Sequence, residues 1–476
     1  MDSLLHVSRE SPGGIAAVLA TAGLPGAEAT ALAAETPVPT GDFEADRARF
    51  SAYWRRSSAL LDRLPAKPKR DDKSARAAEA IQQAARAART AFAEANADTV
   101  YRHLTRGLAR HVHLETMIYD AADLVPGLVP ARAEVDAELA RRQADKEGIE
   151  IDQGLFLARL LAKESLALHL LHSMMLPLPE SLDRRADFAC SGRADIGKAR
   201  VERNGDVATV TMANIEALNA EDGTTLFPLE GAIDLALLDP ATRVCVLRGA
   251  AVKHPKFAGR RLFGAGLNLT DLYWGRIPYL FYISREMGLV NKIYRGLTRA
   301  GDPPDETIAL PHEKLWIAAV EEFAIGGQCQ LLLCMDYVLA ARGSYATLPA
   351  RKEGITPGMA NMRLPRFVGD RIARQAIQYG RRIDFDTPEG RMIADEIVEP
   401  TGMDRALMDV AAGLTDSGAV SAISNRRAFR IAQEPLSLMA RYLSIYCREQ
   451  AYCLASPALI ENLERFWDAA NKRPKS

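Results

Sequence analysis

The sequence predicts an α/β fold with an all-helical domain before it and further helices after it. Three observations predict this architecture. Apolar residues recur at three- and four-residue spacing from about residue 42 to 182, where helix-forming residues dominate. Residues 199–213 alternate in polarity around an Asn-Gly pair, which is typical of a β-hairpin. Beyond this hairpin, strand-like apolar runs alternate with helical segments, as in layered α/β domains.

The length of the chain and these changes of pattern predict its division into domains. A chain of 476 residues is too long for one compact core. The first segment is rich in Ala, Gly, Pro and Thr and has weak periodicity, so we expect it to be irregular. The expected order is an irregular lead-in (1–45), a helical N-terminal domain (46–195), an α/β core (196–415) and a C-terminal helical region (416–476).

Each later element has its own signal. Residues 244–250 and 337–343 are apolar runs of strand length, and the apolar run 315–327 ends in a Gly-Gly pair. Residues 423–455 return to helical periodicity. We expect this last segment to pack on the core or on a neighbouring subunit.

The composition excludes several classes of function. Lys and Arg number 60 against 61 Asp and Glu, so the net charge of −1 offers no footprint for nucleic acid. The six cysteines form no CxxC pair, which indicates reduced thiols in a cytoplasmic protein. No secretory signal is recognisable, and no apolar run approaches the roughly 20 residues that span a bilayer. The histidines lack the spacing of a metal site, so we predict no metal.

Two glycine-containing loops are the candidate site of chemistry. The first is FGAGLNL (263–269), and the second is FAIGGQCQ (323–330), which follows an apolar strand and opens an apolar helix. Glycines there let the backbone approach a ligand closely, and two N–H groups from separate loops would form an oxyanion hole. Either loop alone could be an ordinary tight turn. Their order and spacing of about 60 residues favour a shared site.

From about residue 199 to 398 the chain resembles the crotonase (enoyl-CoA hydratase/isomerase) superfamily. The motifs that carry the resemblance follow one another in register. They are EALNA (216–220), FGAGLNL (263–269), IGGQCQ (325–330), MD (335–336) to Ala341, LP (348–349), GITPG (354–358) and RLPR (363–366). The resemblance implies a crotonase-type ββα spiral core and an acyl-coenzyme A thioester as the substrate.

The resemblance also implies roles for single residues. The two oxyanion-hole donors of the family fall on the backbone N–H groups of Leu267 and Gly327, and its basic contacts to coenzyme A fall near Arg260 or Arg261. A solvated surface position is the alternative for both arginines. The remaining positions that would line the thioester site are Ala265, Gly266, Ile325 and Gly326.

The chain departs from a hydratase at the two acid/base positions. Hydratases of this superfamily use two glutamates, and the matching positions here are Gln330 and Ala350. A Gln amide does not exchange a proton near neutral pH, and Ala has no group to exchange. A simple enoyl-CoA hydratase is therefore not expected.

A longer resemblance is to one branch of the superfamily that has a helical N-terminal extension. Its members are cofactor-independent dioxygenases that act on 3,5-dihydroxyphenylacetyl-CoA in glycopeptide-antibiotic biosynthesis. The similar segments are residues 108–130, 141–162 and 348–367. The resemblance implies O₂ as co-substrate, no metal or organic cofactor, and a homo-oligomer, either trimer or hexamer.

In this branch the polar residues that hold the dihydroxyphenyl ring fall on Glu221, Arg285 and Gln330. Without the resemblance, Glu221 could be a surface helix residue and Arg285 could pair with Glu286. Gln328 stands where most relatives have a third glycine. Two alternatives to the dioxygenase stay open: a hydrolase or isomerase of another aryl-CoA, and a non-catalytic acyl-CoA-binding protein.

Overall fold

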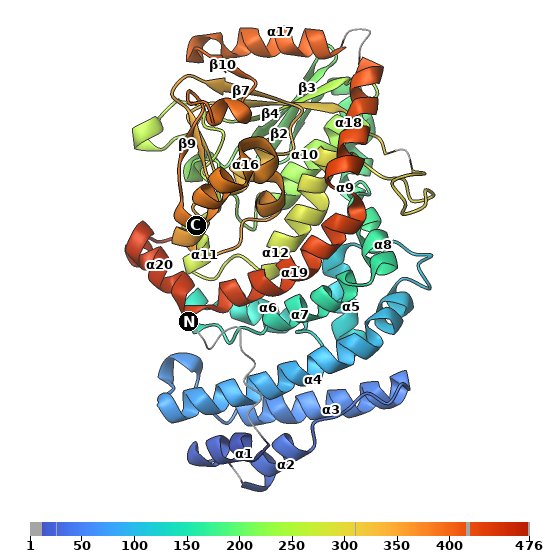
Figure 1. The fold of residues 1–476 in the computed structure, drawn as a ribbon, viewed down its shortest axis with the longest axis vertical. Helices are drawn as coiled ribbons and strands as arrows, with labels where there is room; N and C mark the ends of the chain where they lie inside the picture. Colours follow the sequence, from blue (N-terminus) through green and yellow to red (C-terminus); the bar gives the residue numbers. More distant parts are fainter. Residues whose placement is uncertain (1–11, 25, 310, 416–418, 475–476) are drawn as a thin grey trace. The chain divides into compact units, whose positions relative to one another are not determined.

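The chain folds into two compact units, each built from discontinuous segments. The fold, shown in Figure 1, comes from a computed structural model that describes residues 12–24, 26–309, 311–415 and 419–474. The first unit comprises residues up to Leu170 with Trp274–Tyr279 and Ala440–Ile460. The second comprises Leu171–Tyr273, Leu280–Met439 and the residues from Glu461 onward. The four successive domains expected from the sequence remain a prediction.

The first unit is helical, which confirms the predicted helical N-terminal region. Its two longest helices, α3 (Phe43–Leu61) and α4 (Asp72–Leu104), lie side by side (Figure 1). The ring centroids of Phe50 and Trp54 on α3 lie 5.2 and 5.6 Å from that of Phe92 on α4, which stabilises the pair by aromatic packing. The other helices that begin in this unit are α1 (Pro12–Thr21), α2 (Gly26–Ala34), α5 (Leu114–Leu124), α6 (Arg132–Leu139), α7 (Ile151–Leu161) and α8 (Glu164–Met174).

Helices α1 and α2 contradict the expectation of an irregular lead-in over residues 12–34. Both helices are rich in Ala, and Ala has the highest helix propensity, which outweighs the Gly and Pro residues between them. Leu19, Leu24 and Leu32 are buried, so tertiary packing adds to that propensity. Residues 1–11, which belong to the same prediction, lie outside the described residues.

The second unit is built on a seven-stranded sheet in the order β1-β2-β3-β4-β5-β7-β10. The predicted hairpin is present: β2 and β3 pair antiparallel around Gly205, whose φ of 62° suits the turn. From β3 to β10 the neighbouring strands run parallel. The strands are β1 (Arg193–Asp195), β2 (Ala199–Asn204), β3 (Val207–Met212), β4 (Val244–Gly249), β5 (Leu315–Val320), β7 (Tyr337–Ala341) and β10 (Glu396–Val398).

A second, three-stranded sheet carries the glycine loops. Its strands β6 (Phe323–Ile325) and β8 (Tyr345–Thr347) pair parallel, and β9 (Ile383–Asp384) pairs antiparallel with β8. Strand β6 is separated from β5 by only two residues, so the chain passes directly from the large sheet into the small one. This passage places the Gly-Gly turn at the end of β6.

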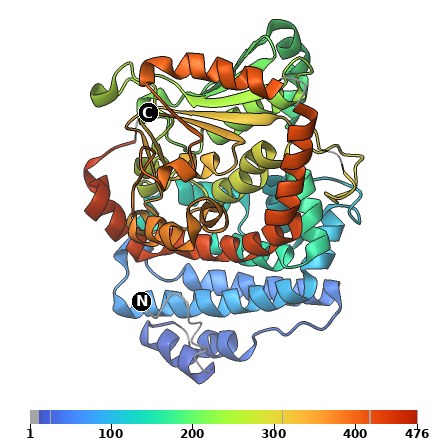
Figure 2. The same cartoon turned by 45° about the horizontal axis from the view of Figure 1, so that its top comes forward.

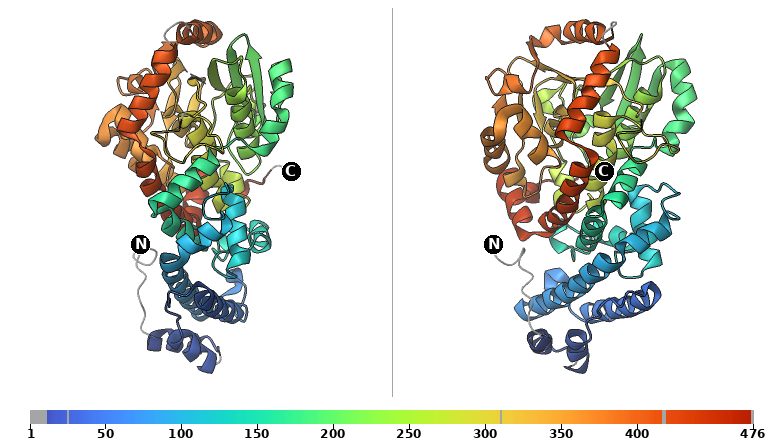
Figure 3. Two further views of the ribbon diagram at one scale, coloured as in Figure 1. Left: turned by 90° about the vertical axis from the view of Figure 1, so that its right-hand side faces the viewer. Right: turned by 45° about the vertical axis from the view of Figure 1, so that its right-hand side comes forward.

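Helices cover the large sheet and explain its apolar strands. All six residues of β4 and of β5 are buried, as expected for parallel strands packed on both faces. Helix α10 (Leu226–Leu238) packs on β2 and β3, and α17 (Met403–Thr415) closes a core over β4, β5 and β7 (Figures 2 and 3). The mixed α/β architecture predicted from the sequence is therefore confirmed.

The second unit contains further α-helices before, between and after these strands. They are α9 (Pro179–Ser191), α11 (Leu269–Tyr273), α13 (Asn291–Arg295), α14 (Gly327–Leu332), α15 (Ala350–Glu353), α16 (Ala360–Tyr379) and α18 (Ala419–Gln433). Helices α12 (Tyr279–Ser284), α19 (Leu436–Ala455) and α20 (Pro457–Trp467) have residues in both units. None of the helices in the described part of the chain is long and apolar enough to cross a membrane.

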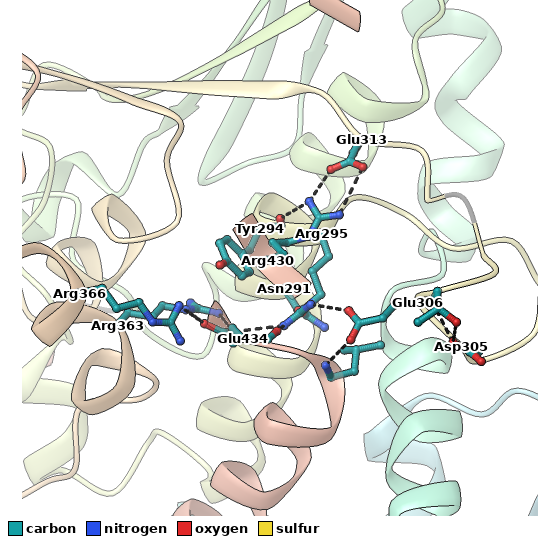
Figure 4. Close-up of polar contacts among 12 residues, drawn as sticks. Asn291, Tyr294, Arg295, Asp305, Glu306, Glu313, Arg363, Arg366, Arg430 and Glu434 are labelled. Carbon is teal, nitrogen blue, oxygen red and sulfur yellow. Dashed lines mark hydrogen bonds and ion pairs between the residues drawn. The ribbon is translucent and has the colours of Figure 1, made fainter. Parts of the chain in front are cut away.

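A buried ion-pair network ties α13, α16 and the segment between α18 and α19 together (Figure 4). Glu434 is fully buried, and its carboxylate lies 2.8 Å from Nη2 of Arg363 and 3.0 Å from Nη1 of Arg366. Arg295 donates to the backbone carbonyl of Glu434 and pairs with Glu306 at 3.0 Å. Burial alone would raise the pKa of Glu434, but the surrounding arginines, Arg363 first, lower it to about 2.

Candidate active site

The first glycine loop is fixed by backbone hydrogen bonds on both sides. On one side, the N–H of Gly264 donates to Phe323 O at 3.2 Å, and the N–H of Ile325 donates to Gly264 O at 3.0 Å. On the other side, the N–H of Glu221 donates to Gly266 O, and the N–H of Asn268 donates to Glu221 O, both at 2.7 Å. Because Glu221 is bonded to the residues before and after Leu267, the N–H of Leu267 points to the opposite side of the loop.

The second glycine loop begins where β6 ends. Gly326 has φ 55° and ψ −116°, a conformation that favours glycine, and its N–H donates to Thr347 O at 2.8 Å. Gly327 then opens α14. The two loops touch through their glycines, since a Cβ added to Gly326 would lie 3.4 Å from the Cα of Gly266. A Cβ at Gly266 would lie only 3.0 Å from Ile325 O, so a side chain there would force the two loops to shift.

Two backbone donors are left over where these loops meet. Within the described residues, neither the N–H of Leu267 nor that of Gly327 has a hydrogen-bond acceptor. Both residues are half-buried, and Gly327 opens a helix, whose first N–H groups have no partner within the helix, so both donors are open to an acceptor from outside the chain. These are the two positions named from the sequence as oxyanion donors.

The three polar residues predicted to contact the substrate ring come together beside Gly327. Nε of Arg285 lies 2.9 and 3.0 Å from the two carboxylate oxygens of Glu221. Nη1 of Arg285 donates to Oε1 of Gln330 at 2.9 Å, and Nη2 donates to Gly327 O at 2.7 Å. All three side chains are buried. They come from segments far apart in the sequence, and the fold joins them in one hydrogen-bonded cluster.

Glu286 is a fourth member of this cluster. Its Oε1 accepts from Nη1 of Arg285 at 2.6 Å, while its Oε2 is buried without a hydrogen-bond partner among the described residues. Burial raises the pKa of Glu286, although Arg285 opposes the shift. For Arg285, burial alone would lower the pKa, but Glu221 and Glu286 outweigh it and the pKa is raised. Arg285 is therefore a permanent cation facing two carboxyl groups.

Arg285 is held in place by a π-helical turn, η5 (Arg285–Val290). Such wide turns recur at functional sites. This turn packs closely on Glu230, since a Cβ added to Gly288 would lie 2.8 Å from Oε1 of that residue. The carboxylate of Glu230 is fully buried and pairs with Nζ of Lys292 at 2.7 Å. Asp234 shares the same ammonium at 2.9 Å, and burial raises its pKa to about 6 against the effect of Lys292. This charged support was not anticipated from the sequence.

Neither position that corresponds to the acid or the base of a hydratase carries an acidic residue, but a carboxyl group not anticipated from the sequence follows the second position by three residues. Gln330 and Ala350 occupy the two positions. Glu353, one turn after Ala350 on α15, is buried, and its carboxyl has no hydrogen-bond or ion-pair partner among the described residues. Burial alone raises its pKa to about 7. A glutamate within KEG gives no sign in the sequence that it is buried.

The two arginines expected to contact coenzyme A are exposed. Arg260 pairs with Glu322 and lies over the ring of Phe257, with 5.7 Å from its guanidinium carbon to the ring centroid. Nη1 of Arg261 donates to Gly249 O at 3.5 Å. Both therefore remain candidates for phosphate contacts. Among the described residues, no group of three or more His, Cys, Asp or Glu side chains is arranged to hold a metal ion.

A known family accounts for both the glycine loops and the sheet that carries them. The sequence profile described as enoyl-CoA hydratase/isomerase matches residues 202–440, half of the chain. The chain belongs to this family, as the sequence predicted. It is 44% identical over 407 residues to (3,5-dihydroxyphenyl)acetyl-CoA 1,2-dioxygenase of Amycolatopsis orientalis, covering 85% of this chain and 92% of that protein.

Two further matches each cover about half of this chain. Short-chain-enoyl-CoA hydratase of Clostridium acetobutylicum is 26% identical over 236 residues, covering 49% of this chain and 81% of that protein. A crystal structure of an enoyl-CoA hydratase from Mycobacterium avium subsp. paratuberculosis K-10 is 20% identical with a TM-score of 0.47, covering 56% of this chain and 98% of that one. The match to the dioxygenase therefore covers more of this chain than the match to the Clostridium hydratase, 85% against 49%.

Proposed function

We propose that this protein is a dioxygenase that converts 3,5-dihydroxyphenylacetyl-CoA and O₂ into 3,5-dihydroxyphenylglyoxylate and free coenzyme A, in the biosynthesis of glycopeptide-type antibiotics. The observation that carries the proposal is the 44% identity to a dioxygenase of that substrate over 85% of this chain. Part of the helical region before residue 202 lies within the matched length, since the 407 aligned residues exceed the 275 residues of 202–476.

In the proposed mechanism the thioester oxygen accepts hydrogen bonds from the N–H groups of Leu267 and Gly327. Both groups lack an acceptor within the described residues, and the loops that bear them adjoin. Loss of the α-proton places negative charge on this oxygen, and each preorganised donor contributes about 3–4 kcal/mol to stabilising it. The aryl ring shares the charge of the resulting carbanion.

The cluster of Glu221, Arg285 and Gln330 would bind the dihydroxyphenyl ring. Phenolic hydroxyls both donate and accept, and this cluster offers a carboxylate acceptor next to guanidinium and amide groups. The contact from Arg285 to Gly327 O joins the ring-binding cluster to the oxyanion loop. A hydratase is disfavoured because Gln330 and Ala350 replace the acid and base.

The remaining steps balance without a further reductant. The electron-rich carbanion reduces O₂ and forms a C–O bond at the α-carbon, giving a peroxide. The peroxide attacks the thioester carbonyl, coenzyme A leaves as the thiol, and cleavage of the O–O bond yields the α-keto acid. Both oxygen atoms enter the product, and its carboxyl group and the thiol carry the two hydrogens lost from the α-carbon.

The proposal includes independence from metal and organic cofactors, a homo-oligomeric state and a cytoplasmic location.

Oxygen uptake tests this proposal against its rival. Chelator-treated protein is given 3,5-dihydroxyphenylacetyl-CoA in an oxygen electrode while free thiol is followed in parallel. We expect one O₂ consumed for each thiol released. Thiol release without O₂ uptake would identify a thioester hydrolase, and binding without thiol release would identify a non-catalytic acyl-CoA-binding protein.

A further inference from the structure

The side chain of Gln328 connects the two glycine loops. It is fully buried, although it stands where a third glycine was expected from the family. Its Oε1 accepts from the N–H of Gly266 at 2.6 Å, and its Nε2 donates to Asn219 O at 3.4 Å. Both ends of the amide are therefore used, one by the first loop and the other by the EALNA segment.

The positions of these contacts relate directly to the two unpaired donors. Gln328 follows Gly327 in the sequence, and Gly266 precedes Leu267. One side chain thus joins the immediate neighbour of each donor. The first loop leaves room for it because Gly264 lacks a side chain: a Cβ there would lie 2.6 Å from Cγ of Gln328.

The amide nitrogen of Gln328 donates to the backbone of Asn219, a residue that is itself fixed by side-chain hydrogen bonds. Nδ2 of Asn219 donates to Ala250 O and to Leu262 O, both at 2.9 Å. Ala250 directly follows β4, so this bond fastens the EALNA segment to the end of a central strand. Gln328 therefore links the second loop to a fixed point of the sheet as well as to the first loop.

We propose that Gln328 is a positioning residue that sets the distance and direction between the N–H groups of Leu267 and Gly327. The inference rests on the proposed oxyanion hole. Gly266 is buried, has φ 81°, and as a glycine can rotate its backbone more freely than other residues. Without Gln328 the N–H of Gly266 lacks its acceptor, so its peptide turns to find another. Rotation at Gly266 also turns the next peptide, which carries the N–H of Leu267.

Replacement of Gln328 tests the inference in the full-length protein. Gln328→Met keeps a similar volume and removes both hydrogen bonds. Gln328→Glu keeps an acceptor for Gly266 and, when protonated, also a donor for Asn219. The control is Cys329→Ala, a truncation at the next buried position of the same helix. Steady-state turnover is measured together with the infrared carbonyl band of [carbonyl-¹³C]phenylacetyl-CoA bound under anaerobic conditions.

We expect Gln328→Met to lower kcat about 10- to 100-fold with little change in KM, because a misplaced donor affects the transition state more than binding. The bound carbonyl band should lie at higher wavenumber than in the wild type. Gln328→Glu should recover part of both changes, more so at low pH, and Cys329→Ala should behave as the wild type. If Gln328→Met fails to fold, Gln328→Glu at high pH, where its carboxylate no longer donates, provides the comparison.

The carbonyl band separates the failure of this inference from that of the oxyanion hole. If wild-type protein lowers the band relative to free thioester and Gln328→Met lowers it equally with unchanged kcat, Gln328 has no positioning role. If wild-type protein leaves the band at its value in water, the oxyanion hole itself is wrong and the role of Gln328 falls with it.

Discussion

Replacing Gly327 with Ala should disable the site while leaving the fold largely intact. A Cβ at this position would lie 2.0 Å from Oε2 of Glu221 and 3.0 Å from Nη2 of Arg285. Ordinary van der Waals contact needs about 3.5 Å, so the carboxylate or the loop must move by about 1.5 Å. Glu221 is held by two hydrogen bonds from Arg285 and is buried, so it has little room to move. The loop and its N–H are therefore displaced.

The size of the effect follows from the proposed chemistry. Loss of one oxyanion donor costs about 10²- to 10³-fold in kcat, and a misplacement of about 1 Å costs about 10²-fold. We expect Gly327→Ala to lower kcat at least about 100-fold. The thermal midpoint should fall as well, because the substitution disturbs the buried pair of Glu221 and Arg285.

The assay is O₂ uptake and thiol release with 3,5-dihydroxyphenylacetyl-CoA, alongside thermal unfolding. Gly413→Ala is the matched control, since nothing lies within 4 Å of a Cβ at this helical position. That control should turn over normally and be more stable by about 0.5–1 kcal/mol. Wild-type kcat in a folded Gly327→Ala variant would refute the assignment of this loop to the site.

Three other substitutions test charges in the second unit. The pKa of Glu434 is about 2, below its ordinary 4.5, so its contribution to stability is present above pH 4.5 and is lost as the pH falls toward 2. Glu434→Gln should therefore lower the free energy of unfolding by about 3 kcal/mol at pH 7 and by much less at pH 3. The pKa of Glu353 is about 7, above its ordinary 4.5, so the wild type loses stability as the pH rises from 4.5 through 7. Glu353→Gln should be as stable as the wild type near pH 4 and more stable by up to about 3 kcal/mol at pH 8. Equal stability of the two proteins at pH 8 would contradict the burial of Glu353 as an unpaired acid. Arg285→Lys should lower kcat/KM about 10- to 150-fold, because it loses at least one charge-assisted hydrogen bond worth about 1.5–3 kcal/mol.

Local chemistry explains what the sequence predicted well. The Asn-Gly turn, the apolar strands β4 and β5 and the Gly-Gly junction after β6 each depend on a few consecutive residues. The family resemblance then selected Glu221, Arg285 and Gln330, which the fold brings together. Helices α1 and α2 were missed because Gly and Pro obscured an Ala-rich composition that packing completes.

Features made by tertiary contact were not predictable from one sequence. The sequence showed only that Gln328 replaces a glycine found in most relatives, whereas its two hydrogen-bond partners lie 62 and 109 residues away. The burial of Glu353 and the charged pair of Lys292 with Glu230 likewise depend on neighbours from distant segments. A single sequence shows the charge of such residues but not their surroundings.

The fate of the two atoms of O₂ tests the central claim most directly. Chelator-treated protein is given 3,5-dihydroxyphenylacetyl-CoA under ¹⁸O₂ in ordinary water, and the keto acid is weighed promptly by mass spectrometry. A carbanion that captures O₂ and whose peroxide then opens the thioester delivers both labelled atoms, so the product should be four mass units heavier. An unlabelled acid, with its new oxygen taken from water, would contradict the proposed dioxygenase.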